Sequence, residues 1–242
     1  MRCSRLYTPA TLATGSTVEL QDKASHYLCR VLRLKPGDAV ILFNGDGFDY
    51  CGTLAGRKGG NLTIELGSRQ MADNESALQT TLAQAVSRGE RMDYCLQKAT
   101  ELGVTRIQPL LCSRVEVRLT NRRLENRLEH WRGVVIAACE QSGRARVPEV
   151  AAPLELHDFL ARTGGAQRFL LDPGARGKLS ECALGARQAA VLVGPEGGFT
   201  AGEVERARHH GVEVVRLGPR VLRTETAGPA ALAVLQAVAG DF

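Results

Sequence analysis

Two short stretches near the C-terminus constrain the fold of this chain more than any other feature. Residues 193–200 (VGPEGGFT) and 217–227 (LGPRVLRTETA) each follow a run of apolar, β-branched residues, and each leads into a helical pattern. Both are therefore predicted to be turns that connect a strand to a helix. Ligands of open α/β sheets bind beyond the carboxyl ends of the strands, where such turns lie. Together the turns predict a ligand-binding α/β domain.

The first turn contains residues that let a ligand approach the backbone closely. Its three glycines lack a Cβ atom and permit positive φ. Thr200 and Glu203 form a T-x-x-E pattern, which predicts that the next helix begins there. No GxxxxGK(S/T) loop is present and no GxGxxG loop opens a helix after a strand, so a triphosphate or dinucleotide site is not expected. Taken alone, the stretch also fits an ordinary tight turn; a second turn dense in charge is harder to explain by packing.

The amino-acid sequences of the two turns resemble the cofactor-binding signature of the SPOUT methyltransferases, and they are similar to the RsmE family in particular. The resemblance implies a SPOUT-type α/β domain with a C-terminal deep trefoil knot, preceded by a small PUA-like β-barrel. It also implies a homodimer that uses S-adenosylmethionine as cofactor. The implied reaction is methylation of N3 of a specific uridine in the 16S rRNA of the small ribosomal subunit.

The chain divides into two predicted domains. Residues 1–70 carry short alternating runs with a hairpin signal at Asn44-Gly45, which predicts a small β-barrel; the resemblance makes it a PUA-like RNA-binding domain. Residues 71–78 are polar and are predicted to be a linker. Residues 79–242 alternate between strand and helix patterns, and the resemblance makes them the SPOUT methyltransferase domain.

The overall composition fits a cytoplasmic protein. The net charge of +5 suits a polyanionic partner without proving one. No apolar run approaches the roughly 20 residues that span a bilayer, and the N-terminus lacks the apolar core of a signal peptide, so no membrane partner is expected. The seven cysteines are dispersed without a C-x-x-C pair, which predicts free thiols and no metal site.

The resemblance assigns cofactor binding to three loops, the first of which follows a strand at residues 168–173. The implied cofactor-binding residues are Leu171, Asp172, Pro173, Gly194, Pro195, Glu196, Gly197, Gly198, Leu217, Gly218, Val221, Leu222, Thr226 and Ala227.

Charged residues of the second turn are the catalytic candidates. Uracil N3 carries a proton and is a poor nucleophile until that proton leaves, so the site needs a base or cations that stabilise the anion. Arg220 and Arg223 suit the second role, and Glu225 is a candidate base or a group that orients the arginines. A structural ion pair between Arg223 and Glu225 is the alternative.

Four arginines are candidates for RNA contacts. Arg30 and Arg33 cluster in the predicted barrel, although a solvated helix face explains them equally well. Arg88 stands where the family pattern leads us to expect lysine, and Arg144 follows a group of polar residues at a helix end. The basic stretch that begins at Arg114 is interpreted as a solvated face.

Two other functions stay open at this point. One is a SPOUT methyltransferase that acts on ribose or on tRNA, against which the full-length resemblance argues. The other is a non-catalytic RNA-binding factor for ribosome assembly, and cofactor binding would distinguish it. Family behaviour favours the assembled small subunit over free rRNA as substrate, but nothing in the residues shows it.

Overall fold

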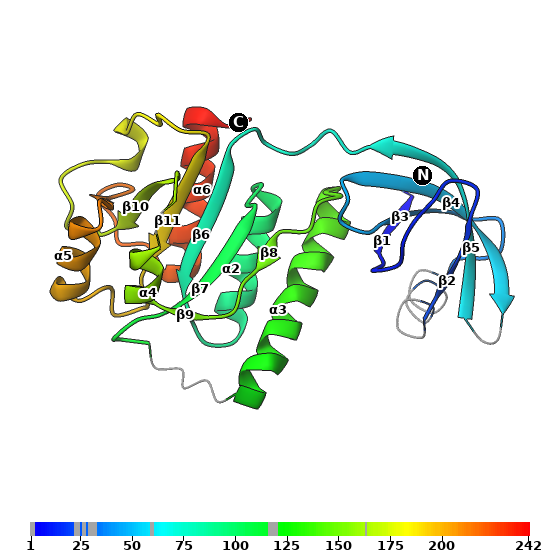
Figure 1. Cartoon of the computed structure of the whole chain (residues 1–242), viewed down its shortest axis with the longest axis horizontal. Coiled ribbons are helices and arrows are strands. Elements are labelled where there is room, and N and C mark those ends of the chain that lie inside the picture. The colour runs from blue at the N-terminus through cyan, green and yellow to red at the C-terminus, as the bar shows by residue number, and fades with distance from the viewer. Residues whose placement is uncertain are drawn as a thin grey trace. The chain divides into compact units, whose positions relative to one another are not determined.

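The computed structural model describes residues 3–21, 25, 28, 33–58, 61–115, 121–162 and 164–242, with the side chains of 121–123 excepted (Figure 1). The chain forms two compact units. The first comprises Met1–Glu75 and Cys139–Val147, and the second comprises Ser76–Ala138 and Pro148–Phe242. The division after Glu75 falls within the predicted linker at 71–78. The predicted second domain, residues 79–242, contains Cys139–Val147, a segment that packs with the first unit. The domain limits at 70 and 79 stay a prediction.

The first unit is a five-stranded sheet in the order β1-β3-β4-β5-β2. Its strands are β1 (Ser4–Tyr7), β2 (Thr17–Leu20), β3 (Ala39–Phe43), β4 (Phe48–Lys58) and β5 (Asn61–Met71). Strands β1 and β3 are parallel, and the other pairs are antiparallel. One apolar core takes side chains from all five strands, including Leu6 of one edge strand and Val18 of the other. Irregularities after Cys51 and Leu54 interrupt the β4–β5 register, and such bulges bend a strand around its core.

The second unit is built on a parallel sheet in the order β12-β10-β11-β6-β7-β8, with β9 also paired to β7. Its strands are β6 (Gln79–Ala85), β7 (Arg106–Leu111), β8 (Glu149–Val150), β9 (Leu154–Glu155), β10 (Gln167–Leu171), β11 (Gln188–Val193) and β12 (Glu213–Val215). All recorded pairs are parallel. Because β12, β10 and β11 are neighbours, the loops that follow them leave the sheet at one edge.

Helices lie on both faces of this parallel sheet (Figure 1). They are α2 (Glu90–Glu101), α3 (Asn121–Ser142), α4 (Leu156–Ala161), α5 (Ala201–His209) and α6 (Thr224–Ala239), together with the 3₁₀ turn η2 (Leu179–Glu181). Alternation along β6 separates the faces, because successive side chains of a strand point to opposite sides. Ala83 belongs to a core shared with α4 and α5, whereas its neighbours Leu82 and Gln84 approach Gly228 of α6.

The local predictions succeed where the pattern is long or carries a cap. The predicted capping box at Thr200 and Glu203 is confirmed, with both reciprocal hydrogen bonds formed. The sequence predicts a last helix from about Thr226 to Val238 with Pro229 in its first turn. The helix begins at Thr224, so Pro229 lies in its second turn. The short elements β1, β8, β9 and α4 were not predicted. The sequence also predicts one short helix at 25–32, of which only residues 25 and 28 are described.

Within the described ranges, no helix combines the length and the apolar character needed to cross a membrane.

Candidate functional site

A cavity of about 790 Å³ lies in the second unit, among the loops that follow β10, β11 and β12. It is lined by all of the predicted cofactor-binding residues except Thr226. The catalytic candidates Arg220, Arg223 and Glu225 line it as well. Residues that are 54 positions apart in the chain, such as Leu171 and Glu225, therefore meet in one site because their strands are adjacent in the sheet.

The first turn is held in place by two arginines from other elements. Arg91 of α2 forms an ion pair with Glu196, with 2.9 Å between Nη1 and Oε1. Arg114, in the loop after β7, donates from Nη1 to the carbonyl of Gly197 at 2.5 Å. Within the turn, the amide of Gly198 donates to the carbonyl of Pro195, and Gly198 has a φ of 68°, which favours glycine. The turn is thus fixed from outside and from within.

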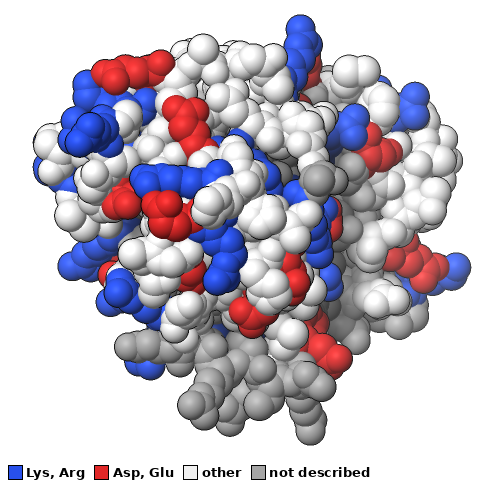
Figure 2. Space-filling view, turned by 60° about the vertical axis from the view of Figure 1, so that its left-hand side comes forward, with Lys and Arg blue, Asp and Glu red and all other residues white. Residues whose placement is uncertain are grey.

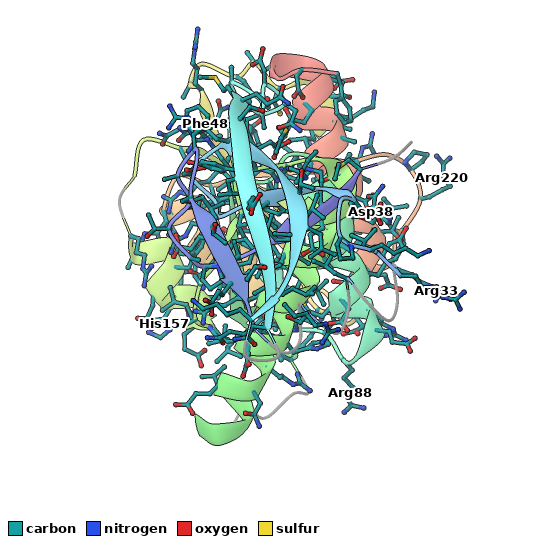
Figure 3. All side chains as sticks on the ribbon, turned by 90° about the vertical axis from the view of Figure 1, so that its right-hand side faces the viewer. Arg33, Asp38, Phe48, Arg88, His157 and Arg220 are labelled. Atoms are coloured by element: carbon teal, nitrogen blue, oxygen red, sulfur yellow. The ribbon has the colours of Figure 1, made fainter. Side chains whose placement is uncertain are left out.

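The second turn is directly bonded to the first. The hydroxyl of Thr224 donates to the carbonyl of Gly194 at 2.8 Å. The side chain of Arg223 is 81% exposed and that of Glu225 is 14% exposed, with 4.0 Å between Nη1 and Oε1. That separation exceeds hydrogen-bonding distance, so the contact is a weak ion pair. Arg220 is exposed and extends away from its loop (Figure 3).

The residues of the cavity fit the cofactor that the sequence predicts. The volume falls in the range of about 300–1,000 Å³ that small-molecule sites occupy. The space where a Cβ of Gly218 would stand is open, with no atom within 4 Å, so a ligand can lie against this backbone. Leu171 and Leu222 supply partly buried apolar wall. Among the described residues, the Nε of Arg216 is buried and has no hydrogen-bond partner, and Arg216 is one of the residues that line the cavity.

The RNA-binding candidates differ in their surroundings. Arg33 and Arg88 are exposed and extend away from the ribbon (Figure 3). Arg144 is 4% exposed, and its Nε and Nη2 donate to Glu75 at 2.9 and 2.6 Å. Its side chain is therefore occupied by an ion pair inside the first unit. Arg30 lies outside the described residues.

Basic and acidic side chains are interspersed over the face of the molecule that Figure 2 shows, so the positive net charge is not gathered into one patch there.

The buried thiols of Cys95 and Cys112 are protonated at neutral pH. Burial raises the pKa of Cys95 to about 12, and the negative charge of Glu225 adds to the effect. Burial likewise raises the pKa of Cys112 to about 12. The cysteines in the described parts of the chain are all free. No group of three or more His, Cys, Asp or Glu side chains suited to a metal ion is found in those parts.

Six lining residues and one tie to the first turn are not among the site residues that the sequence predicts. The six lining residues are Arg91, Val193, Phe199, Val204, Arg216 and Thr224. Thr224 lies between the catalytic candidates Arg223 and Glu225 in the sequence, and this position is the signal that identifies it as a residue of the site. Arg114 was expected on a solvated face; it is exposed, but its bond to Gly197 gives it a part in the site.

Comparison with protein families gives matches over most of the chain. Residues 74–236 match the RNA methyltransferase domain family. Residues 20–66 match the RNA methyltransferase PUA domain family. The N-terminal match covers most of the first unit's sheet, and the other contains every residue that lines the cavity.

Full-length relatives and solved structures agree with these matches. The chain is 31% identical to ribosomal RNA small subunit methyltransferase E of Buchnera aphidicola subsp. Schizaphis graminum, over 100% of this chain and 98% of the relative. It is 38% identical to ribosomal RNA small subunit methyltransferase E of Neisseria gonorrhoeae, solved with S-adenosylmethionine, with a TM-score of 0.93 and 100% of both chains covered. A methyltransferase structure from Legionella pneumophila with bound S-adenosylmethionine is 36% identical, with a TM-score of 0.96 and 100% of both chains covered.

Proposed function

This chain belongs to the ribosomal RNA small subunit methyltransferase E family, and we propose that it methylates N3 of a uridine in 16S rRNA with S-adenosylmethionine as methyl donor. One observation carries the proposal. The cavity is formed by both motif turns, in a fold that matches S-adenosylmethionine-bound relatives over the full length of both chains. The chain is thus an S-adenosylmethionine-dependent rRNA methyltransferase, and N3 of uridine is the target that its motifs favour.

The loops of the cavity position the two reactants. S-adenosylmethionine, when bound, supplies an electrophilic methyl group on a sulfonium ion. Backbone groups of Gly194, Gly197 and Gly218 and the wall residues around them would hold the cofactor in one orientation. Orientation of this kind contributes several kcal/mol to a displacement reaction, up to about 7–11 kcal/mol in the best cases.

Residues of the second turn handle the N3 proton and the charge that its loss creates. As the bond between N3 and the methyl carbon forms, the sulfur–carbon bond breaks, and the N3 proton must pass to a base or to water. Glu225 is our candidate acceptor, since its carboxylate lines the cavity and is mostly buried. Arg220 and Arg223 are our candidates to stabilise the uracil anion, because both line the cavity and Arg223 forms only a weak ion pair.

Several finer features belong to the same proposal. We infer a trefoil knot in residues 79–242, supported by the SPOUT signature of the two motif turns. We infer a homodimer, for which the exposed apolar Val238 and Phe242 offer surface. We place the protein in the cytoplasm, acting on the assembled small subunit.

RNA contacts by the first domain complete the proposal. Arg33, like Arg88 of the second domain, has an exposed side chain, and both are our candidates for contacts with phosphates. Arg30 stays a candidate on the sequence alone. A direct contact by Arg144 would require its pair with Glu75 to open, so we rank it behind the others.

A methyl-transfer assay tests the proposal. Unmethylated small subunits and bare 16S rRNA are each incubated with labelled S-adenosylmethionine, and the product nucleoside is identified by mass and retention. We expect 3-methyluridine on the subunit. A ribose-methylated product, or product only on tRNA, would contradict the N3 assignment, and the absence of both product and cofactor binding would support the assembly-factor alternative.

A further inference from the structure

A glutamine is fully buried at the end of β6, outside the set of residues that line the cavity. Gln84 has no exposed surface. Burial of an amide without hydrogen bonds costs about 1–3 kcal/mol as judged from protein variants, so its partners are informative. Each polar atom of the amide has one: Nε2 donates to Thr224 Oγ1 at 2.8 Å and to the carbonyl of Ala85 at 3.3 Å, and Oε1 accepts from the thiol of Cys95 at 3.3 Å.

The direction of these bonds is fixed by the atoms themselves. A threonine hydroxyl carries one hydrogen, and the carbonyl of Gly194 can only accept. The hydroxyl of Thr224 therefore donates to Gly194, at 2.8 Å, and must accept from its other neighbour. Of the two polar atoms of the Gln84 amide, only the nitrogen can donate to the hydroxyl of Thr224. The bonds run in one order, from Gln84 to Thr224 to Gly194.

This relay joins the parts of the site that must be in register for methyl transfer. Gly194 is the first residue after β11 and opens the first turn. Thr224 is the first residue of α6 and lies between Arg223 and Glu225. The relay therefore connects the turn expected to hold the cofactor with the residues expected to act on the uracil, across 140 residues of chain from Gln84 to Thr224.

Packing leaves the glutamine little room to move. A Cβ on Gly228 of α6 would lie 3.0 Å from Gln84 Oε1, 3.2 Å from Leu82 Cδ1 and 3.3 Å from Cys95 Sγ. The backbone of α6 thus approaches β6 closely at this point. The amide of Gln84 is held by steric contact as well as by its hydrogen bonds.

We propose that Gln84 is a positioning residue for methyl transfer, which acts through Thr224 to fix the first turn relative to Arg223 and Glu225. The inference rests on the proposed function of the site. Gln84 touches neither reactant, so its replacement removes no group that lines the cavity. Instead, the replacement allows the first turn to move relative to Arg223 and Glu225. A misplacement of about 1 Å can lower the rate by about 100-fold without abolishing binding.

Isosteric variants of the full-length protein test the relay. Gln84→Met removes the amide, Thr224→Val removes the hydroxyl, and Thr224→Ser keeps it. We expect Gln84→Met and Thr224→Val each to lower kcat by about 10- to 100-fold, with KM for S-adenosylmethionine changed by less than about threefold, and Thr224→Ser to retain most of kcat. The double variant Gln84→Met/Thr224→Val should be no slower than the slower single variant, because both remove one relay.

The matched control is Thr100→Val. Like Thr224, Thr100 is a buried threonine of the second unit, and its hydroxyl donates to the carbonyl of Leu96 within α2. Its replacement should lower the melting temperature to a similar degree and leave kcat unchanged. If Gln84→Met lowered the melting temperature as Thr100→Val does but kept the wild-type kcat, Gln84 would be merely structural and the inference would be wrong.

Hydrogen exchange of the cofactor-free protein gives a readout that does not depend on activity. Peptides covering residues 194–200 and 220–227 should exchange faster in Gln84→Met than in wild type, and Thr100→Val should not affect them. Unchanged exchange in Gln84→Met would overturn the inference. Failure of the proposed function is distinguishable, since it would appear as absence of methylated product in the wild-type protein.

Discussion

Gly218 faces the cavity with open space where a Cβ would stand, and its φ lies outside the left-handed region. The substitution of valine at this position therefore causes no backbone strain, and the methyl groups of the valine occupy the place expected for the cofactor. We expect Gly218→Val to weaken S-adenosylmethionine binding at least about 10-fold, equivalent to about 1.4 kcal/mol, with an unchanged melting temperature. Calorimetric titration measures the affinity.

The control for this substitution is Gly185→Val. Gly185 also has open space around its Cα, but it lies in an exposed loop and does not line the cavity. Equal affinities of the two variants for the cofactor would show that the cofactor does not lie against Gly218.

Arg223 allows the catalytic and the structural interpretation of the second turn to be separated. Its side chain is 81% exposed and 4.0 Å from Glu225, and exposed ion pairs contribute only about 0–1 kcal/mol to stability. We expect Arg223→Met to lower kcat by about 100-fold, as loss of a group that stabilises a developing anion does, without changing the melting temperature. Single-turnover rates and thermal unfolding are the two measurements.

The opposite pattern would favour the structural ion pair. In that case Arg223→Met would lower the melting temperature and leave the single-turnover rate of the folded protein near wild type. Arg208→Met is the matched control, because Arg208 is also an exposed arginine with an acidic neighbour, Glu205, and it does not line the cavity.

At the scale of elements, the capping box of α5 is also a tie between two loops. Glu203 accepts hydrogen bonds from the amide and hydroxyl of Thr200 and, at 2.9 Å, from the amide of Ser113 in the loop after β7. Burial raises the pKa of Glu203, but the hydrogen bonds from Ser113 and Thr200 outweigh it and hold the pKa below its usual value of 4.5. The ionised carboxylate is therefore the form that the fold stabilises.

The sign of the pH dependence follows from that shift. Because the pKa is lower in the folded state, the stabilisation is complete above the unfolded pKa and is lost as the pH falls through the folded one. We expect Glu203→Gln to be less stable than wild type by about 1–2 kcal/mol at pH 7, with the difference narrowing below about pH 4.5. Urea unfolding at several pH values measures it. If the difference in unfolding free energy did not change with pH, the role given to the Glu203 carboxylate would be contradicted. An equal effect of Glu205→Gln, on the exposed face of α5, would contradict it as well.

The elements that the sequence predicted correctly are those whose determinants are local. Thr200 and Glu203 are three residues apart and specify their helix start by bonds to each other. The start of α6 was placed two residues late because its N-cap, Arg223, makes no side-chain cap and leaves no local signal. Likewise β8 has only two residues, which form a strand because β7 lies beside them.

The residues of the candidate site also divide into those that a local sequence signal identifies and those that depend on a distant partner. The glycine-rich and charged turns could be found from their composition, since a close backbone approach requires glycine wherever it occurs. Gln84 could not, because Thr224, the partner that connects it to the site, is 140 residues away. Arg114 was likewise assigned to solvent because its partner, Gly197, is 83 residues distant.

At the scale of the whole molecule, Arg144 belongs to the segment Cys139–Val147, which contains the last turn of α3 and packs with residues 1–75. Its bidentate pair with Glu75 is mostly buried, with side-chain exposures of 4% and 21%. Asn74, the neighbour of Glu75, also donates to the carbonyl of Gly143 at 2.8 Å. These contacts attach the segment to the first unit, so Arg144 should stabilise that unit and not bind RNA directly.

The prediction at this scale is that Arg144→Met destabilises the first unit of the full-length protein. Loss of the Arg144 guanidinium leaves the Glu75 carboxylate mostly buried and unpaired. In a fully buried pair such a loss lowers the stability by up to about 3–5 kcal/mol, and the effect is smaller here because Glu75 is partly exposed. Hydrogen exchange should rise in peptides from 4–75 and 139–147 and stay unchanged in 76–138. The double variant Arg144→Met/Glu75→Gln should recover part of the loss, since no charge is left unpaired. If Arg144→Met instead weakened RNA binding with no change in exchange, Arg144 would be an RNA contact as its sequence position first suggested, and the ion pair would be one that opens to admit the substrate.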